Sequence, residues 1–202
     1  MTITLYGIAS SRAVRCMWML EELGIPYEHV KTDYRAGDTR TSDYLKINPN
    51  GHIPTMQDGD LTLFESMAIN LYLAMKYAKD MWPASVEDQA RAIQWSFWGM
   101  TELEPQLLQV LAHRVALPED RRDDARANAA WSKLRAPLMV LEAALGGRDF
   151  LLGNAFSVAD LNVASILSWA RVAKATMEPF PQVDHWLTAC LERPAFRTAL
   201  KK

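Results

Sequence analysis

The first eighty residues alternate short apolar runs with polar turns, which predicts strands and helices in alternation. Ile3 to Tyr6 is a β-prone run, and from Ser11 apolar positions recur at helical spacing until the stop signal Gly24-Ile25-Pro26. Residues 27–31 alternate as a second strand, and the polar stretch Thr32 to Arg40 predicts a loop. The chain therefore begins with a strand, a helix and a strand.

The next segment adds a short helix, a hairpin and a longer helix. A helix over residues 42–47 is expected to end at Asn48-Pro49-Asn50-Gly51, because the residue before a proline avoids the α region. Residues 53–57 and 61–64 flank an Asp-Gly-Asp turn, which predicts a β-hairpin. Residues 66–79 carry apolar side chains over a broad helical face.

From about residue 86 the pattern is helical throughout. It predicts long helical segments over Glu87 to Val115 and Arg122 to Leu145, and shorter ones after Ser157, Pro181 and Pro194. The expected organisation is an α/β domain over residues 1–79, a linker over 80–86 and an all-helical domain over 87–202.

Composition and charge limit the partners and the kinds of site that we expect for this chain. Half of the 202 residues are apolar, and 22 Lys plus Arg nearly balance 24 Asp plus Glu without a basic stripe, so we expect no nucleic-acid partner. No apolar run approaches the roughly 20 residues that span a bilayer, and no leader pattern is present, so we expect no membrane partner and a cytoplasmic location. Cys16 and Cys190 are far apart and the four His are scattered, which argues against a disulfide framework and a metal site.

Three short motifs admit both a structural and a functional interpretation. Ile53-Pro54 is an ordinary proline at a strand edge or, if cis, a turn that presents the Ile53 N–H and C=O to an extended peptide. Glu65-Ser66 is a plain helix cap or a clamp for a zwitterion. Ser157-Val-Ala-Asp160 resembles a capping box, with Phe156 and Leu161 as its hydrophobic staple, and is a folding element.

The order and spacing of these motifs resemble a cytosolic glutathione transferase over the full length. The resemblance rests on the βαβ-αββα thioredoxin-like unit, Asn48-Pro49-x-Gly51-x-Ile53-Pro54, the Glu65-Ser66 pair eleven residues later, and the Ser157-x-x-Asp160 box in a helical second domain. It implies a thioredoxin-like N-terminal domain, an all-α C-terminal domain, and glutathione as co-substrate without a metal. Features of serine-type, theta, phi and chi members are all present.

The resemblance also assigns glutathione-binding residues. Pro54 is expected to be cis, Ile53 to bond the cysteinyl backbone, and Glu65 and Ser66 to hold the γ-glutamyl end. His52 stands where many members carry a Lys that pairs with the glycyl carboxylate, and this departure puts a strong ionic contact in doubt.

Counting along the family pattern makes Ser11 the thiol-activating residue, five residues past Tyr6 and four before Arg15. Ser10 is an alternative, because a one-residue shift of the loop exchanges the two serines. Arg12 is another, since chi-type members use a Ser-Arg-Ala sequence here. Cys16 lies inside the helix and is expected to be a packed thiol.

The electrophile is expected to be hydrophobic and to bind between the domains. Candidate residues are Ile8, Ala9, Trp98 and Thr101, although an aromatic stripe at helical spacing is more often core. Family members usually form homodimers, and the resemblance implies transferase activity in detoxification. The alternatives are a glutathione-dependent isomerase, reductase or dehalogenase, or a non-catalytic interaction module with the same fold.

Overall fold

The computed structural model describes residues 2–78 and 80–202 and divides into two compact units. Unit 1 combines Met1–Trp82 with Arg193–Lys202, and unit 2 is Pro83–Glu192. The sequence placed residues 193–202 in the helical domain, whereas the contacts of this segment assign it to unit 1. Lys79, at the end of the expected N-terminal domain, lies outside the described residues.

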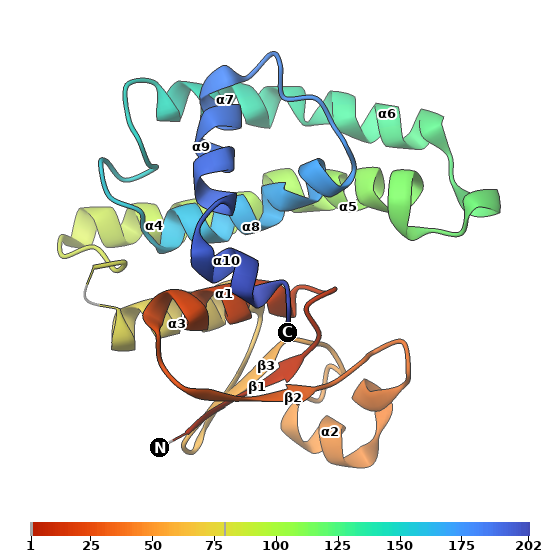
Figure 1. Cartoon of the computed structure of the whole chain (residues 1–202), viewed down its shortest axis with the longest axis vertical. Helices are drawn as coiled ribbons and strands as arrows, with labels where there is room; N and C mark the ends of the chain where they lie inside the picture. Colours follow the sequence, from red (N-terminus) through yellow and green to blue (C-terminus); the bar gives the residue numbers. More distant parts are fainter. Residues whose placement is uncertain (1, 79) are drawn as a thin grey trace. The chain divides into compact units, whose positions relative to one another are not determined.

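Unit 1 has the thioredoxin-like order of elements that the sequence predicted (Figure 1). Its elements are β1 (Ile3–Gly7), α1 (Ala13–Leu23), β2 (Tyr27–Lys31), η1 (Asp38–Arg40), α2 (Ser42–Ile47), β3 (Thr55–Asp58), β4 (Leu61–Phe64), α3 (Ser66–Tyr77) and α10 (Pro194–Ala199). The predicted strand over 53–57 begins at Thr55, directly after Pro54, which has no N–H for a ladder.

The four strands form one mixed sheet in the order β2-β1-β3-β4. β1 is parallel to β2 and antiparallel to β3, and β3 is antiparallel to β4. Leu5 lies opposite Met56, and both side chains are fully buried, which marks the core face of the sheet. α1 packs against β1, α3 and α10, so this buried helix is the centre of unit 1.

Residues 193–202 are fastened to α1 by an ion pair and an aromatic contact. The guanidinium of Arg193 donates from Nε and Nη2 to the two carboxylate oxygens of Glu22, at 2.7 and 2.8 Å. Phe196 packs on Trp18 with ring centroids 4.6 Å apart. A bidentate guanidinium–carboxylate contact fixes the relative orientation of the two groups and also pairs their charges. It therefore holds α10 in a defined position against α1.

Unit 2 is helical, as predicted. Its elements are α4 (Val86–Trp98), η2 (Gly99–Leu103), α5 (Glu104–Leu111), η3 (Ala112–Ala116), η4 (Glu119–Arg121), α6 (Asp124–Lys133), α7 (Arg135–Leu145), α8 (Val158–Val172) and α9 (Pro181–Leu191). The second long helix predicted from the sequence is interrupted at Leu134. Pro137 explains the interruption, because it has no N–H to bond the carbonyl of Lys133 and its ring crowds that carbonyl.

The capping box at the start of α8 is confirmed, and the Asp160 carboxylate does more than cap. One oxygen accepts from the backbone N–H and hydroxyl of Ser157, at 2.9 and 2.8 Å. The other accepts from the N–H of Leu151 at 2.8 Å and from Nε1 of Trp186 at 2.9 Å. Burial raises the pKa of this carboxyl, and the four donors oppose that shift. Asp160 therefore ties α8, α9 and the segment before α8 together.

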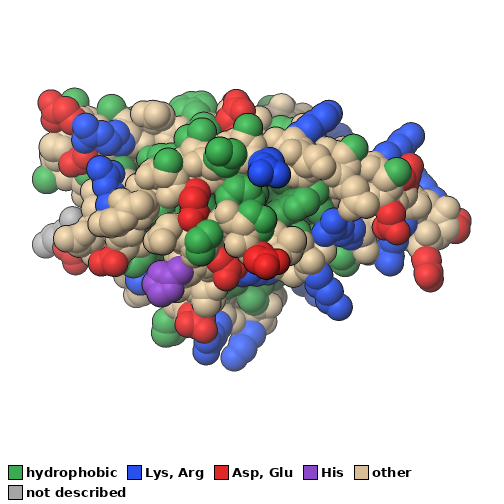
Figure 2. Space-filling model, turned by 90° about the horizontal axis from the view of Figure 1, so that it is seen from above, with side chains coloured by type: hydrophobic (Ala, Val, Ile, Leu, Met, Phe, Trp, Pro, Cys, Tyr) green, Lys and Arg blue, Asp and Glu red, His purple; other side chains and the backbone are tan. Residues whose placement is uncertain are grey.

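The surface carries mixed charge. On the face shown in Figure 2, acidic and basic side chains are interspersed, and hydrophobic side chains gather near its centre. Among the residues that the structure describes, no helix is both long and apolar enough to cross a bilayer.

We expect Asp160→Ala to destabilise the fold without weakening ligand binding in unit 1. The substitution leaves three buried N–H donors without an acceptor, so the free energy of unfolding should fall by about 3 kcal/mol or more. Chemical denaturation measures this loss. Asp123→Ala is the matched control, because Asp123 caps α6 with a bond from Arg126 N at the surface, and its loss should cost only about 1 kcal/mol. Equal losses in the two variants would contradict the role given to Asp160.

Candidate functional site

The strand register brings the predicted binding residues to one edge of the sheet. Tyr6 pairs with Thr55, and Thr55 pairs with Phe64. The next residues beyond these pairs are Gly7, Pro54 and Glu65, so the end of β1, the start of β3 and the end of β4 meet at one place. We call this place the sheet edge site, and it comprises residues 7–12, 52–54 and 65–66.

Gly7 sets how closely the loop before α1 approaches Ile53. Its φ is +149°, and a Cβ added there would collide with the Cβ of Ala13 and lie 3.6 Å from the Cβ of Ile53. Only glycine fits this position without strain. The absence of a side chain therefore lets residues 8–12 lie beside Ile53.

The peptide bond between Ile53 and Pro54 is cis, as the resemblance implied. The preceding carbonyl, that of His52, accepts hydrogen bonds from Tyr44 Oη at 2.6 Å and Asn48 Nδ2 at 2.9 Å. Within the described part of the chain, no hydrogen bond engages the N–H or C=O of Ile53. The segment is thus held rigidly while one donor and one acceptor are left for an extended ligand.

Glu65 and Ser66 stand at the N-terminus of α3. Glu65 is exposed and has φ +71° and ψ +113°, a conformation that costs a non-glycine residue of order 1–3 kcal/mol. Ser66 is buried, and its Oγ accepts from Nη1 of Arg15 at 3.4 Å. Strain of this kind persists where the surrounding structure imposes it, and it is common at ligand sites.

Ser11 lies in the turn before α1, with its hydroxyl engaged in two local hydrogen bonds. Its Oγ donates to the carbonyl of Ile8 at 2.7 Å and accepts from the N–H of Ala13 at 3.1 Å. The hydroxyl therefore sits at the N-terminus of α1, among backbone donors that favour negative charge. To donate to a ligand, it must rotate away from Ile8.

The two alternatives to Ser11 lie in the same turn. Ser10 is exposed, and its Oγ accepts from Nη2 of Arg35 at 3.1 Å. Arg12 is half-buried and immediately precedes α1. The position of each residue is compatible with a role near a bound sulfur, so the choice among the three stays a prediction.

The contacts of Tyr6 and Cys16 do not favour a role in stabilising a bound thiolate. The hydroxyl of Tyr6 donates to Gln57 Oε1 at 2.8 Å, and its ring contacts Tyr44 on the face of the sheet opposite the Leu5 core. Cys16 is fully buried, its Sγ lies 3.7 Å from the carbonyl oxygen of Ser66, and burial raises the pKa of its thiol. Cys16 is a packed thiol, as predicted.

His52 is exposed, and the guanidinium of Arg40, which the sequence reasoning missed, lies against the preceding residue, Gly51. A Cβ added at Gly51 would lie 2.8 Å from Nη1 of Arg40, so this guanidinium rests against Gly51. Within the described residues, no hydrogen bond or ion pair engages the Arg40 side chain. The pattern gave no signal for Arg40, because residues 32–40 were assigned only to a polar loop.

The residues expected around the electrophile lie in both units. In unit 1, Ile8 is buried and Ala9 is half-buried. In unit 2, Trp98 is half-buried and stacks edge-on against Trp95 at 4.9 Å, while the Thr101 hydroxyl donates to the carbonyl of Phe97 at 3.2 Å. Their role in holding an electrophile stays a prediction.

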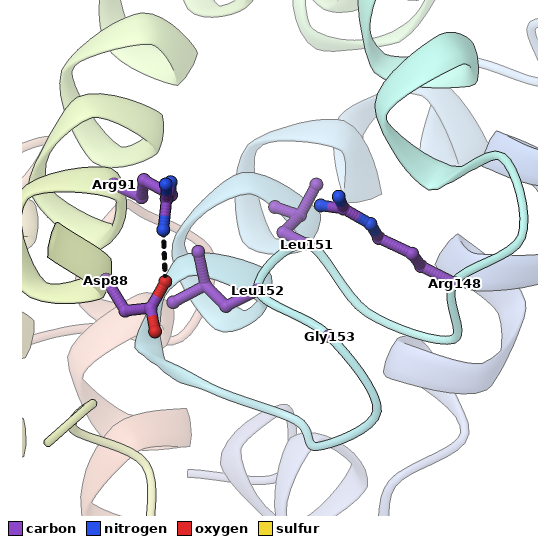
Figure 3. A pocket seen from close by; sticks show the side chains of 6 residues that line it. All are labelled: Asp88, Arg91, Arg148, Leu151, Leu152 and Gly153. Carbon is purple, nitrogen blue, oxygen red and sulfur yellow. Dashed lines mark hydrogen bonds and ion pairs between the residues drawn. The ribbon is translucent and has the colours of Figure 1, made fainter. Parts of the chain in front are cut away.

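Unit 2 also contains a cavity of about 370 Å³ that none of the predicted residues lines (Figure 3). Its lining is Asp88, Arg91, Arg148, Leu151, Leu152 and Gly153. The Arg91 guanidinium is neutralised by Asp88 at 2.6 Å, an ion pair between neighbouring turns of α4.

Comparison with known proteins agrees with the geometry. The N-terminal domain model of glutathione S-transferases matches residues 1–75, and the C-terminal domain model matches residues 103–194. The chain is 33% identical to glutathione S-transferase GstB of Escherichia coli strain K12, covering 96% of each chain, and 34% identical to glutathione S-transferase 3 of Zea mays, covering 96% of this chain and 91% of that one.

A solved structure supports the same relationship. The theta class glutathione S-transferase of Xanthomonas axonopodis pv. citri, with glutathione bound, superposes with a TM-score of 0.92 at 30% identity, covering 100% of this chain and 98% of that one. Both domain models, relatives over nearly the whole length and the shared fold lead to one conclusion: this chain belongs to the glutathione S-transferase family.

Proposed function

We propose that the chain binds glutathione at the sheet edge site, stabilises its thiolate and transfers it to a hydrophobic electrophile. One observation carries the proposal: the open N–H and C=O of Ile53 lie between the turn that holds Ser11 and the N-terminus of α3. An extended tripeptide with a central thiol and a zwitterionic end matches that order of groups. The family membership of the chain supports the same activity.

Each part of glutathione has a partner in unit 1. The cysteinyl backbone pairs with Ile53 as an added strand. The α-carboxylate of the γ-glutamyl group lies at Ser66, where the N-terminus of the twelve-residue α3 favours an anion. The ammonium group lies at the exposed carboxylate of Glu65.

Ser11 stabilises the thiolate in this proposal. A cysteinyl thiol has a pKa of about 8.5 and is mostly protonated at neutral pH, although the thiolate is the nucleophile. Lowering that pKa by about two units requires about 2.7 kcal/mol of preferential stabilisation. One hydrogen bond from the Ser11 hydroxyl to the charged sulfur, together with the N-terminus of α1, supplies a contribution of that size. The thiolate then attacks the electrophilic carbon and a C–S bond forms. In a substitution, the bond from that carbon to the leaving group breaks and the group departs with the electron pair. In a conjugate addition, the carbon–carbon π bond opens and the resulting carbanion takes a proton from water.

Arg40 and His52 receive the glycyl carboxylate. The exposed guanidinium of Arg40 lies against Gly51, one residue before His52, so a permanent cation stands at this end of the site. This placement supports an ionic contact with the glycyl carboxylate although His52 replaces the usual Lys.

We further propose that the chain acts as a homodimer in the cytosol. Large apolar side chains are exposed on both units, including Met75 at 54% and Phe97 at 66%, and such surface is typical of protein interfaces. The two cysteines are buried as free thiols, which suits a reducing compartment.

We expect Ser11→Ala to impair thiol activation and to leave glutathione binding nearly intact. Without the hydroxyl, the pKa of the bound thiol should rise by about one to two units, so turnover at neutral pH should fall by about 10- to 100-fold and recover as the pH is raised. Ultraviolet absorbance of the bound thiolate and pH–rate profiles measure these effects. Ser10→Ala is the matched control and should change neither. An unaltered pH–rate profile in Ser11→Ala would move the role to Ser10 or Arg12.

We expect Glu65→Gly to stabilise the chain while weakening its ligand binding. Glycine adopts φ +71° without the side-chain penalty, so the free energy of unfolding should rise by about 1 kcal/mol. The loss of the carboxylate should weaken glutathione binding by about tenfold. Glu65→Gln keeps the strained backbone, so it should lose affinity without gaining stability. Denaturation and calorimetry separate the two effects, and a destabilised Glu65→Gly variant would show that the strain has been misjudged.

We expect Arg40→Gln to reduce glutathione affinity more than His52→Ala does. An exposed charge pair contributes up to about 1 kcal/mol, so the dissociation constant should rise by about threefold to fivefold, and the effect should shrink at high salt. Binding of glutathione amidated at its glycyl carboxylate should not respond to Arg40→Gln. Calorimetry at two salt concentrations tests this, and equal losses for the two ligands would contradict an ionic contact.

A further inference from the structure

The cavity in unit 2 lies between the first two turns of α4 and the segment that joins α7 to α8 (Figure 3). Its volume of about 370 Å³ falls in the range of about 300–1,000 Å³ that is usual for small-molecule pockets. An apolar cavity of about 150 Å³ holds one benzene molecule, so this one has room for a compound of about two rings. None of the residues that line it belongs to the sheet edge site.

One wall of the cavity is apolar and is held in place by hydrogen bonds. Phe150 and Gly153 exchange backbone hydrogen bonds of 2.9 and 3.1 Å, and the N–H of Leu151 donates to the Asp160 carboxylate at 2.8 Å. Leu151 is buried and Leu152 is half-buried. A Cβ added at Gly153 would meet nothing within 4 Å, so the space beside this residue is open. A ligand therefore finds a wall that is already ordered, which lowers the entropic cost of binding.

The charged groups that line the cavity leave one positive charge uncompensated. One oxygen of the Asp88 carboxylate accepts from Arg91 Nη1 at 2.6 Å, and the other accepts from the Ser85 hydroxyl at 2.8 Å. Within the part of the chain that the structure describes, no hydrogen bond or ion pair engages the Arg148 guanidinium. Figure 3 shows this guanidinium beside Leu151 and directed toward α4. An unpaired cation thus stands next to the apolar wall.

We propose that this cavity binds an amphipathic monocarboxylate, with the carboxylate on Arg148 and the apolar body against Leu151 and Leu152. A guanidinium presents a planar pair of donors that matches a carboxylate, and it is more weakly hydrated than an ammonium group. The single excess positive charge suits a monoanion. This binding is separate from the transfer of glutathione and does not depend on it.

The test compares 2-naphthoate with 2-naphthamide, which has the same ring system and shape but no charge. NMR titration of the full-length chain measures both affinities, and the amide signal of Gly153 reports on the cavity. The amide signal of Gly7 reports on unit 1 in the same spectra. Because a naphthalene ring is also a plausible guest for a hydrophobic electrophile site, charge variants of the cavity assign the binding.

The wild-type chain should bind 2-naphthoate with a dissociation constant on the order of 1 mM and shift the Gly153 signal, as expected for a ligand of this size. Arg148→Gln should weaken this binding by about fivefold, the upper range for an exposed ion pair. The amide should bind the wild-type chain about fivefold more weakly than the acid, and Arg148→Gln should leave its affinity unchanged.

Asp88→Asn should have the opposite effect and tighten 2-naphthoate binding by about threefold. It removes the carboxylate that occupies Arg91, so a second guanidinium becomes available to the ligand. Arg121→Gln and Asp120→Asn are the matched controls, because they make the same charge changes in η4, outside the lining of the cavity. Each control should change the affinity by less than about 1.5-fold.

Several results would overturn the inference. They are equal affinities for the acid and the amide, an unchanged affinity in Arg148→Gln, a Gly153 signal that does not shift, and no binding at about 10 mM ligand. Changes in the η4 controls as large as those in the cavity variants would assign the effect to net charge and would also overturn it. None of these results bears on glutathione binding, so the proposed function is tested separately.

Discussion

The antiparallel register of β1, β3 and β4 is the constraint on which the rest of unit 1 depends. Pairing Tyr6 with Thr55 and Thr55 with Phe64 places three chain segments that are distant in sequence at one edge of the sheet. A slip of one residue between β1 and β3 would turn Leu5 away from Met56 and separate Gly7 from Ile53. The same pairing thus fixes both the hydrophobic core and the position of the binding groups.

Much of this fold could be predicted from local signals, because they act within a few residues. Gly24, Pro49 and the turn at Gly59 mark the ends of elements. The bounds of β2, α2 and β4 are those that the sequence pattern predicted. The Ser157-x-x-Asp160 pattern predicted the cap of α8 for the same reason. The break at Leu134 was missed because the apolar periodicity continues through it, although Pro137 was a visible reason to expect it.

The site could be predicted only in part, because its residues act through contacts that periodicity does not encode. Ser11, Ile53, Glu65 and Ser66 were found through a family pattern, whereas the burial of Arg15 and its contact with Ser66 depend on how α1 packs on α3. The strained backbone of Glu65 likewise has no signature in the residue type. In physical terms, the site combines the open N–H and C=O of Ile53 with the strained backbone of Glu65, and both features oppose stability.

The attachment of residues 193–202 to unit 1 has a consequence for the order of synthesis. The ribosome completes residues 1–82 before it makes any of unit 2, but α10 emerges only after all of unit 2 has been made. Until then, Glu22 lacks the Arg193 guanidinium and Trp18 lacks the cover of Phe196. During translation, residues 1–82 therefore expose apolar surface that α10 covers later. The folding of unit 1 is complete only after residues 193–202 have been synthesised.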